Sequence, residues 1–286
     1  MHRLTLDGID VMGERLAQEV AEIIKRRPEV QKISFVAHSI GGLVARYAIG
    51  RLYEPPKRKT PKDIHLLDAH DNVGTICGRE AINFITIATP HLGSRGNKQV
   101  PFLFGITAIE KVASWVVHWI FRRTGKQVFM MDNDEGKPPL LLRMVNDYDD
   151  LYFMSGLRAF KRRVTYANVG YDHIVGWRTS SIRRNFELPK WMGSLSEEYP
   201  HVVYEEQSKA SNNEECVDGS LVNDDFEMLE DKLVRGLTNV SWERVDVSFH
   251  NSILRFAAHS VIQVKLSFMQ SEGEDVIRHM IDHFLV

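Results

Sequence analysis

The chain has 286 residues, of which 43% are hydrophobic and 26% are charged, a balance typical of a globular protein with a sizeable core. The net charge of −2 and the isoelectric point near 6.6 argue against nucleic acid as a main partner, because phosphate binding needs a concentrated positive surface. The simplest expectation is one domain spanning residues 1–286.

The cysteines and the apolar segments indicate the compartment. Cys77 and Cys216 form neither a metal-ligand spacing nor a disulfide framework, so a reducing environment is the default. The N-terminal residues contain no continuous apolar signal core, and no apolar run long enough to span a bilayer follows them. We therefore expect an intracellular, cytoplasmic protein without a signal peptide or transmembrane segment.

Residues 8–27 predict the first helix. Ile9, Met12 and Leu16 recur at helical spacing, and charged residues occupy the other side. Pro28 ends the pattern, because proline cannot continue a helix. This amphipathic helix is expected to pack on a sheet.

Residues 32–50 hold the pattern on which the functional interpretation depends. A short apolar run before Ser39 predicts a strand, and the small and apolar spacing after it predicts a buried helix. A nucleophilic serine at such a sharp junction sits in a strained backbone conformation with its oxygen exposed. The turn needs small neighbours, and Ala37 and Gly41 stand on either side of Ser39.

The helix after Ser39 adds a second chemical feature. A helix N-terminus directs backbone N–H groups toward the space beside Ser39 Oγ, so the N–H of Ile40 is a candidate oxyanion donor. The alternative is a packing turn with an inert Ser39, because the short pattern also occurs without chemistry. His38 adjoins Ser39, but neighbouring side chains on a sharp turn diverge, so we interpret His38 as a packing residue.

Strands and helices alternate along the rest of the chain. Runs of β-branched and apolar residues predict strands at 81–89, 164–169 and 244–249. Apolar residues at helical spacing predict helices at 225–237 and 276–284. The polar stretch 199–218 is interpreted as a flexible excursion. The sequence therefore predicts an α/β fold, with a mostly parallel sheet covered by helices on both faces.

Residues 100–158 interrupt this alternation. The segment from Phe102 to Phe121 is apolar and aromatic but is broken by charges. We interpret 100–158 as a helical lid or cap insertion over a hydrophobic pocket, and the stretch from Phe102 to Phe121 as a peripheral membrane contact. A core helix buried against the body is the alternative.

The remaining chemistry comes from the ends of later strands, where α/β enzymes place site residues. Asp172 follows one predicted strand, and Asp246 is a rival carboxylate within the last one. His250 and His259 both come after that last strand. With Ser39 ahead of them, these residues give the chain order serine, acid, histidine that α/β hydrolases use.

Five segments together match a known pattern: LDGIDVMG, FVAHSIGGLVARYA, ATPHLGS, YDHIVGWRTSSIR and AHSVIQVK. Through them, nearly all of the chain resembles the "putative serine esterase" family of lipase-like α/β hydrolases. The resemblance implies an α/β-hydrolase fold and hydrolysis of carboxylic esters of lipids, with Ser39 as nucleophile. It also favours Asp172 over Asp246 as the acid and His259 over His250 as the base, because both lie in matching segments.

The predicted reaction is acyl transfer. His259 would take the proton of Ser39, Asp172 would hold the imidazole in the right tautomer, and water would later release the acyl group. No cofactor is expected, and the histidines show no paired metal-ligand spacing. Small esters or thioesters are alternative substrates, since a triad does not dictate what is bound.

One part of the family pattern is missing. The fold supplies a second oxyanion N–H from a loop ahead of the nucleophile, and we expect the domain to be N-terminally truncated and to lack this loop. Loss of one such donor lowers the rate by about 10² to 10³. A catalytically impaired α/β hydrolase that acts as a binding or regulatory protein is therefore the second functional hypothesis.

Overall fold

The structure is a computed structural model of the chain. It describes residues 7–56, 74–94, 122–133, 136–191, 193–210, 225–265 and 271–286. The segment from Phe102 to Phe121, for which a lid or membrane contact is predicted, lies outside these residues.

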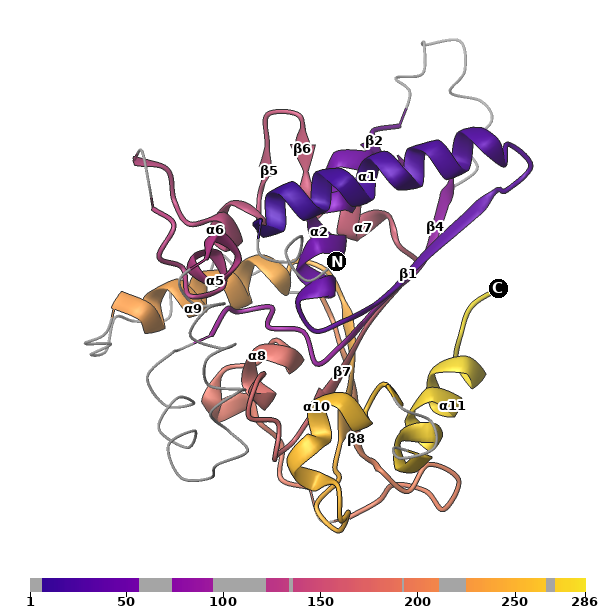
Figure 1. The fold of residues 1–286 in the computed structure, drawn as a ribbon, viewed down its shortest axis with the longest axis vertical. Coiled ribbons are helices and arrows are strands. Elements are labelled where there is room, and N and C mark those ends of the chain that lie inside the picture. Colours follow the sequence, from indigo (N-terminus) through magenta and orange to yellow (C-terminus); the bar gives the residue numbers. More distant parts are fainter. Residues whose placement is uncertain are drawn as a thin grey trace.

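A central five-stranded sheet organises the described part of the chain (Figure 1). In spatial order its strands are β1 (Lys32–His38), β4 (Glu80–Ile87), β7 (Arg162–Asn168), β9 (Trp242–Val247) and β8 (Val202–Ser208). The first four are mutually parallel, and β8 pairs antiparallel with β9. The strands predicted from the sequence are thus confirmed, and their carboxyl ends meet at one edge of the sheet.

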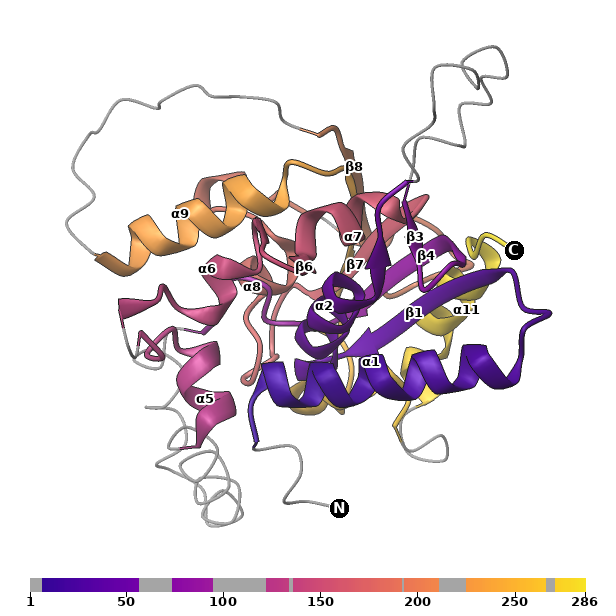
Figure 2. The ribbon, with the colours of Figure 1, turned by 90° about the horizontal axis from the view of Figure 1, so that it is seen from above.

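Helices cover both faces of this sheet (Figure 2). One face carries α1 (Ile9–Arg26), α2 (Ile40–Leu52), α7 (Phe153–Ala159) and α9 (Asp225–Leu237). The other carries α10 (Ala258–Val261) and α11 (Glu274–Asp282). Adjacent strand residues point to opposite faces, so buried Phe84 joins the first core and its neighbour Ile85 joins the second. The result is an α/β fold with a mostly parallel sheet.

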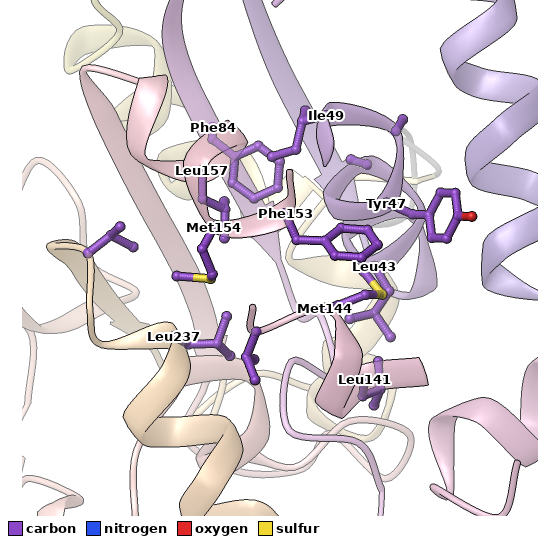
Figure 3. Close-up of a cluster of buried hydrophobic side chains, with 14 of the residues drawn as sticks. Leu43, Tyr47, Ile49, Phe84, Leu141, Met144, Phe153, Met154, Leu157 and Leu237 are labelled. Atoms are coloured by element: carbon purple, nitrogen blue, oxygen red, sulfur yellow. The ribbon is translucent and has the colours of Figure 1, made fainter. Parts of the chain in front are cut away.

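The larger core lies between the sheet and α2 (Figure 3). Leu43 and Ile49 of α2 converge there with Phe84 of β4, Leu157 of α7 and Leu237 of α9. Most residues of α2 are buried, which explains why its sequence is apolar on nearly all sides. This packing fixes the helix that begins directly after Ser39.

Strand β8 was not expected. The range 199–218 was predicted to be a flexible excursion, but Val202–Ser208 pairs with β9 along its whole length. Val202 and Val203 are buried, while Glu205 and Glu206 bind His279 and Arg183. The prediction was wrong because acidic residues that have partners in the fold look like solvent-exposed loop residues in the sequence.

The described part of 100–158 packs against the body. It contains α5 (Arg123–Val128), α6 (Leu140–Arg143) and a small hairpin of β5 (Asp147–Tyr148) and β6 (Leu151–Tyr152), followed by α7. Leu140, Leu141 and Met144 are buried in the larger core. A separate lid stays a prediction for the segment from Phe102 to Phe121, which lies outside the described residues.

The remaining elements are short. A two-stranded sheet pairs β2 (Tyr53–Glu54) with β3 (Thr75–Ile76), and α8 (Trp177–Ser181) follows β7. Single 3₁₀ turns occupy Asn185–Glu187, Arg255–Ala257 and Ser271–Gly273. Within the described ranges, every helix is too short or too polar to cross a bilayer.

Candidate active site

Ser39 lies on the turn between β1 and α2, as the sequence predicts. Its φ of 56° and ψ of −133° are rare for a residue with a side chain, and such strain is typical of functional turns. The turn is held by the Ser39 N–H, which donates to the carbonyl of Ile87 in β4 at 2.8 Å. Ile40 is the first residue of α2, so the helix has no carbonyl four residues earlier to accept its N–H.

The tight neighbour of this turn is Gly42. A Cβ added to Gly42 would lie 2.3 Å from Thr89 Oγ1, whereas one added to Gly41 would lie 3.9 Å from the Cβ of Ala37. The Thr89 hydroxyl donates to the carbonyl of Ser39 at 2.9 Å. Close approach of α2 to the end of β4 therefore depends on Gly42.

The structure brings Ser39, His259 and Asp172 into one hydrogen-bonded line. His259 Nε2 lies 3.0 Å from Ser39 Oγ, and His259 Nδ1 lies 2.9 Å from Asp172 Oδ2. Ser39 and His259 are 220 residues apart in the sequence. Because an ionised carboxylate only accepts, Nδ1 carries the proton and Nε2 is left to accept the Ser39 hydroxyl.

Asp172 sits in a shell of donors just after β7. Asn168 Nδ2 donates to Oδ2 at 2.9 Å, and the N–H groups of Ile174 and Val175 donate to Oδ1 at 3.0 and 2.8 Å. Burial alone would raise the pKa of Asp172, but the hydrogen bonds, above all that of His259, together with the His259 charge, lower it below its usual value. The carboxylate is therefore ionised at neutral pH.

The two rival residues lie in other surroundings. Asp246 is fully buried, and its oxygens accept from Arg183 Nη1 at 3.0 and 2.7 Å and from Trp177 Nε1 at 2.7 Å. His250 is exposed, and its ring packs against the rings of Tyr171 and Trp191. Neither geometry connects these residues to Ser39.

His38 makes a contact that sequence reasoning missed. It was expected only to pack, yet its Nε2 lies 2.7 Å from the backbone carbonyl of His259 and the two rings are 4.6 Å apart. Burial, helped by repulsion from His259, lowers the pKa of His38 to about 4. Its position beside Ser39 was visible in the sequence, but its partner could be found only in the folded chain.

Two other features bear on what could bind. Within the described ranges, no group of three or more His, Cys, Asp or Glu side chains is arranged to hold a metal ion. An apolar groove is lined by Val20 and Ile23 of α1 and by Val30 and Ile33 near the start of β1. Ser39 follows the opposite end of β1, so this groove is separate from the Ser39 site.

The fold and the site together define a class. A mostly parallel α/β sheet that presents a serine on a strained strand-to-helix turn, beside a histidine bonded to a carboxylate, is equipped for nucleophilic chemistry at the serine. The chain belongs to the family described as "Putative serine esterase (DUF676)", whose model matches residues 1–182.

Curated relatives point the same way. The chain is 30% identical over 192 residues to "Putative lipase ROG1" of Saccharomyces cerevisiae, which covers 62% of this chain and 22% of the relative. It is 28% identical over 185 residues to "Putative lipase C4A8.10" of Schizosaccharomyces pombe, which covers 62% of this chain and 20% of the relative. The chain thus spans about a fifth to a quarter of the length of the curated relatives it matches. No solved structure matches it.

Proposed function

We propose that the chain is a serine hydrolase with an α/β-hydrolase fold that cleaves carboxylic esters of lipids. Ser39 is the nucleophile, His259 the general base and Asp172 the acid that orients it. The observation that carries the proposal is the line of hydrogen bonds from Ser39 Oγ through both ring nitrogens of His259 to Asp172. Each atom in that line has the donor or acceptor role that acyl transfer needs.

The reaction follows from these roles. Ser39 Oγ attacks the ester carbonyl carbon while His259 Nε2 takes the hydroxyl proton, and the ionised Asp172 stabilises the imidazolium through its bond to Nδ1. The N–H of Ile40 donates to the oxyanion that develops on the former carbonyl oxygen. The imidazolium then protonates the leaving alcohol. Water, activated by the neutral imidazole, attacks the acyl-enzyme, releases the carboxylic acid and restores Ser39.

The lipid part of the proposal has separate support. The names of the curated relatives refer to lipases, and the segment from Phe102 to Phe121 is apolar and aromatic in sequence. We assign this segment to a lid insertion within a single domain spanning 1–286, where it would contact acyl chains, whereas Leu140, Leu141 and Met144 of the same predicted insertion belong to the larger core.

A fluorophosphonate probe tests the proposal, because it labels only an activated serine. The chain should take up one equivalent of label, Ser39→Ala should take up none, and Ser194→Ala, which removes an exposed loop serine, should label like the wild type. A folded wild-type chain without label would instead favour the non-catalytic binding or regulatory protein. If labelling succeeds, hydrolysis of esters of increasing acyl length separates lipid esters from small esters and thioesters.

A further inference from the structure

The imidazole of His259 reaches Ser39 from a distant part of the sheet. Ser39 follows β1, while His259 follows β9, and β4 and β7 lie between these two strands. At about 4.8 Å between neighbouring strands, the ends of β1 and β9 are roughly 14 Å apart. A loop and the four-residue helix α10 span this distance. Because a helix of four residues has little stability of its own, contacts with the rest of the domain must set its position.

His38 provides such a contact from the end of β1. Its Nε2 lies 2.7 Å from the carbonyl oxygen of His259. A carbonyl can only accept, so Nε2 carries the ring proton and donates it. The neighbouring carbonyls of this turn, which belong to Ala258, Ser260 and Val261, instead accept backbone N–H groups.

The three bonds to His259 have different effects. The bonds of Nδ1 to Asp172 and of Nε2 to Ser39 orient the ring, but they do not fix the main chain that carries it. The main chain is held by the burial of Ala258 and Val261 in the second core and, at His259 itself, by the bond from His38. The His38 ring also lies against the His259 ring, with centroids 4.6 Å apart and planes inclined by 52°. Backbone and ring are therefore held from the same strand end that presents the serine.

The charge state of His38 suits this role. Burial is the main cause that lowers its pKa to about 4, and the charges of His259 and Lys265 add to it, whereas the hydrogen bond to the His259 carbonyl and the charge of Asp172 oppose it. The ring is therefore neutral at pH 7. A neutral donor can support His259 without repelling the imidazolium that forms when the Ser39 proton is transferred.

We propose that His38 is a positioning residue for the catalytic imidazole. It anchors the backbone of His259 to the end of β1. The inference rests on the proposed function, because it concerns the same site. His38 touches neither the serine oxygen nor the substrate in this role and acts only through His259. The separation of Ser39 Oγ from His259 Nε2 then depends on the His38 donor, and a displacement of about 1 Å costs about 10² in rate.

Three substitutions test the donor. His38→Phe keeps a ring but removes the N–H, His38→Gln keeps an amide N–H without the ring, and His250→Phe is the matched control in the same loop region as His259. We expect His38→Phe to lower the rate of fluorophosphonate labelling about 10- to 100-fold. His38→Gln should stay within about fivefold of the wild type, and His250→Phe should not change the rate. Equal rates for His38→Phe and the wild type, or equal losses for the Phe and Gln variants, would overturn the proposal.

A second measurement does not depend on activity. The Nδ1 proton of His259, bonded to Asp172, should give a low-field proton NMR signal that His259→Ala removes. His38→Phe should broaden or shift this signal, and His38→Gln should retain it. A signal unchanged in His38→Phe would refute the positioning role even if the chain proves to have no activity. Absence of labelling with a signal that responds to His38 would refute the proposed function alone.

Discussion

Replacing Asp172 and Asp246 separately by asparagine should affect different properties of the protein. Both carboxylates are buried, but Asp172 contacts His259 whereas Asp246 contacts Arg183. Asp172→Asn removes the negative charge that stabilises the His259 imidazolium, and it no longer holds the proton on His259 Nδ1. The comparable change in a serine protease lowers kcat by about 10⁴. The asparagine oxygen can still accept nearby N–H groups, so the free energy of unfolding should change by only about 1.5 kcal/mol or less.

Asp246→Asn should instead lower stability. The side chains of Asp246 and Arg183 are both fully buried, and the other acidic partner of Arg183, Glu206, is 37% exposed. Breaking a buried ion pair costs about 3 to 5 kcal/mol. The amide oxygen keeps one acceptor and Glu206 stays in place, so we expect about 3 kcal/mol, the lower end of that range. At about 2 to 4 °C per kcal/mol, the melting temperature should fall by about 6 to 12 °C.

The assay combines the rate of fluorophosphonate labelling with thermal unfolding followed by circular dichroism, on the wild type and both variants. Asp172→Asn should lose labelling while its melting temperature falls by no more than about 3 to 6 °C. Asp246→Asn should label normally below its lowered melting temperature. If Asp246→Asn abolished labelling while melting like the wild type, or if Asp172→Asn labelled at the wild-type rate, the roles assigned from the hydrogen bonds would be wrong.

Two further predictions concern stability near the turn. Gly42→Ala should lower the free energy of unfolding in urea by about 1 to 3 kcal/mol, because its Cβ would lie 2.3 Å from Thr89 Oγ1. Gly41→Ala is the control and should stay within about 1 kcal/mol of the wild type. Equal effects of the two substitutions would contradict the close packing of Gly42. The pKa of His38 falls from 6.5 to about 4 on folding, so the unfolded state binds more protons in that window and stability falls as the pH drops. Between pH 7 and pH 5 the free energy of unfolding should fall by on the order of 2 kcal/mol through His38, and His38→Phe should remove this part of the pH dependence. If the wild type and His38→Phe lost stability in parallel over this pH range, the lowered pKa of His38 would be refuted.

Features that depend on neighbouring residues were predictable from the sequence. The helix over 8–27 and the strand, turn and helix around Ser39 follow from local periodicity, and the structure has them at Ile9–Arg26, Lys32–His38 and Ile40–Leu52. The alternation of strands and helices also indicated an α/β fold, because parallel strands need helical crossovers. Strand β8 could not be found in this way, since its acidic residues are explained only by their partners elsewhere in the chain.

The sequence by itself therefore determined the elements and the set of residues from which a site could be built. Local pattern left two acids and two histidines open, and only the family resemblance chose between them. The tertiary structure supplied the contacts themselves: the bonds that join His259 to Ser39 and to Asp172 connect residues 220 and 87 positions apart, and the His38 contact spans 221. The physical reason is that periodicity and turn chemistry act within a few residues, whereas the position of an imidazole depends on strand order and on the packing of loops at the end of the sheet.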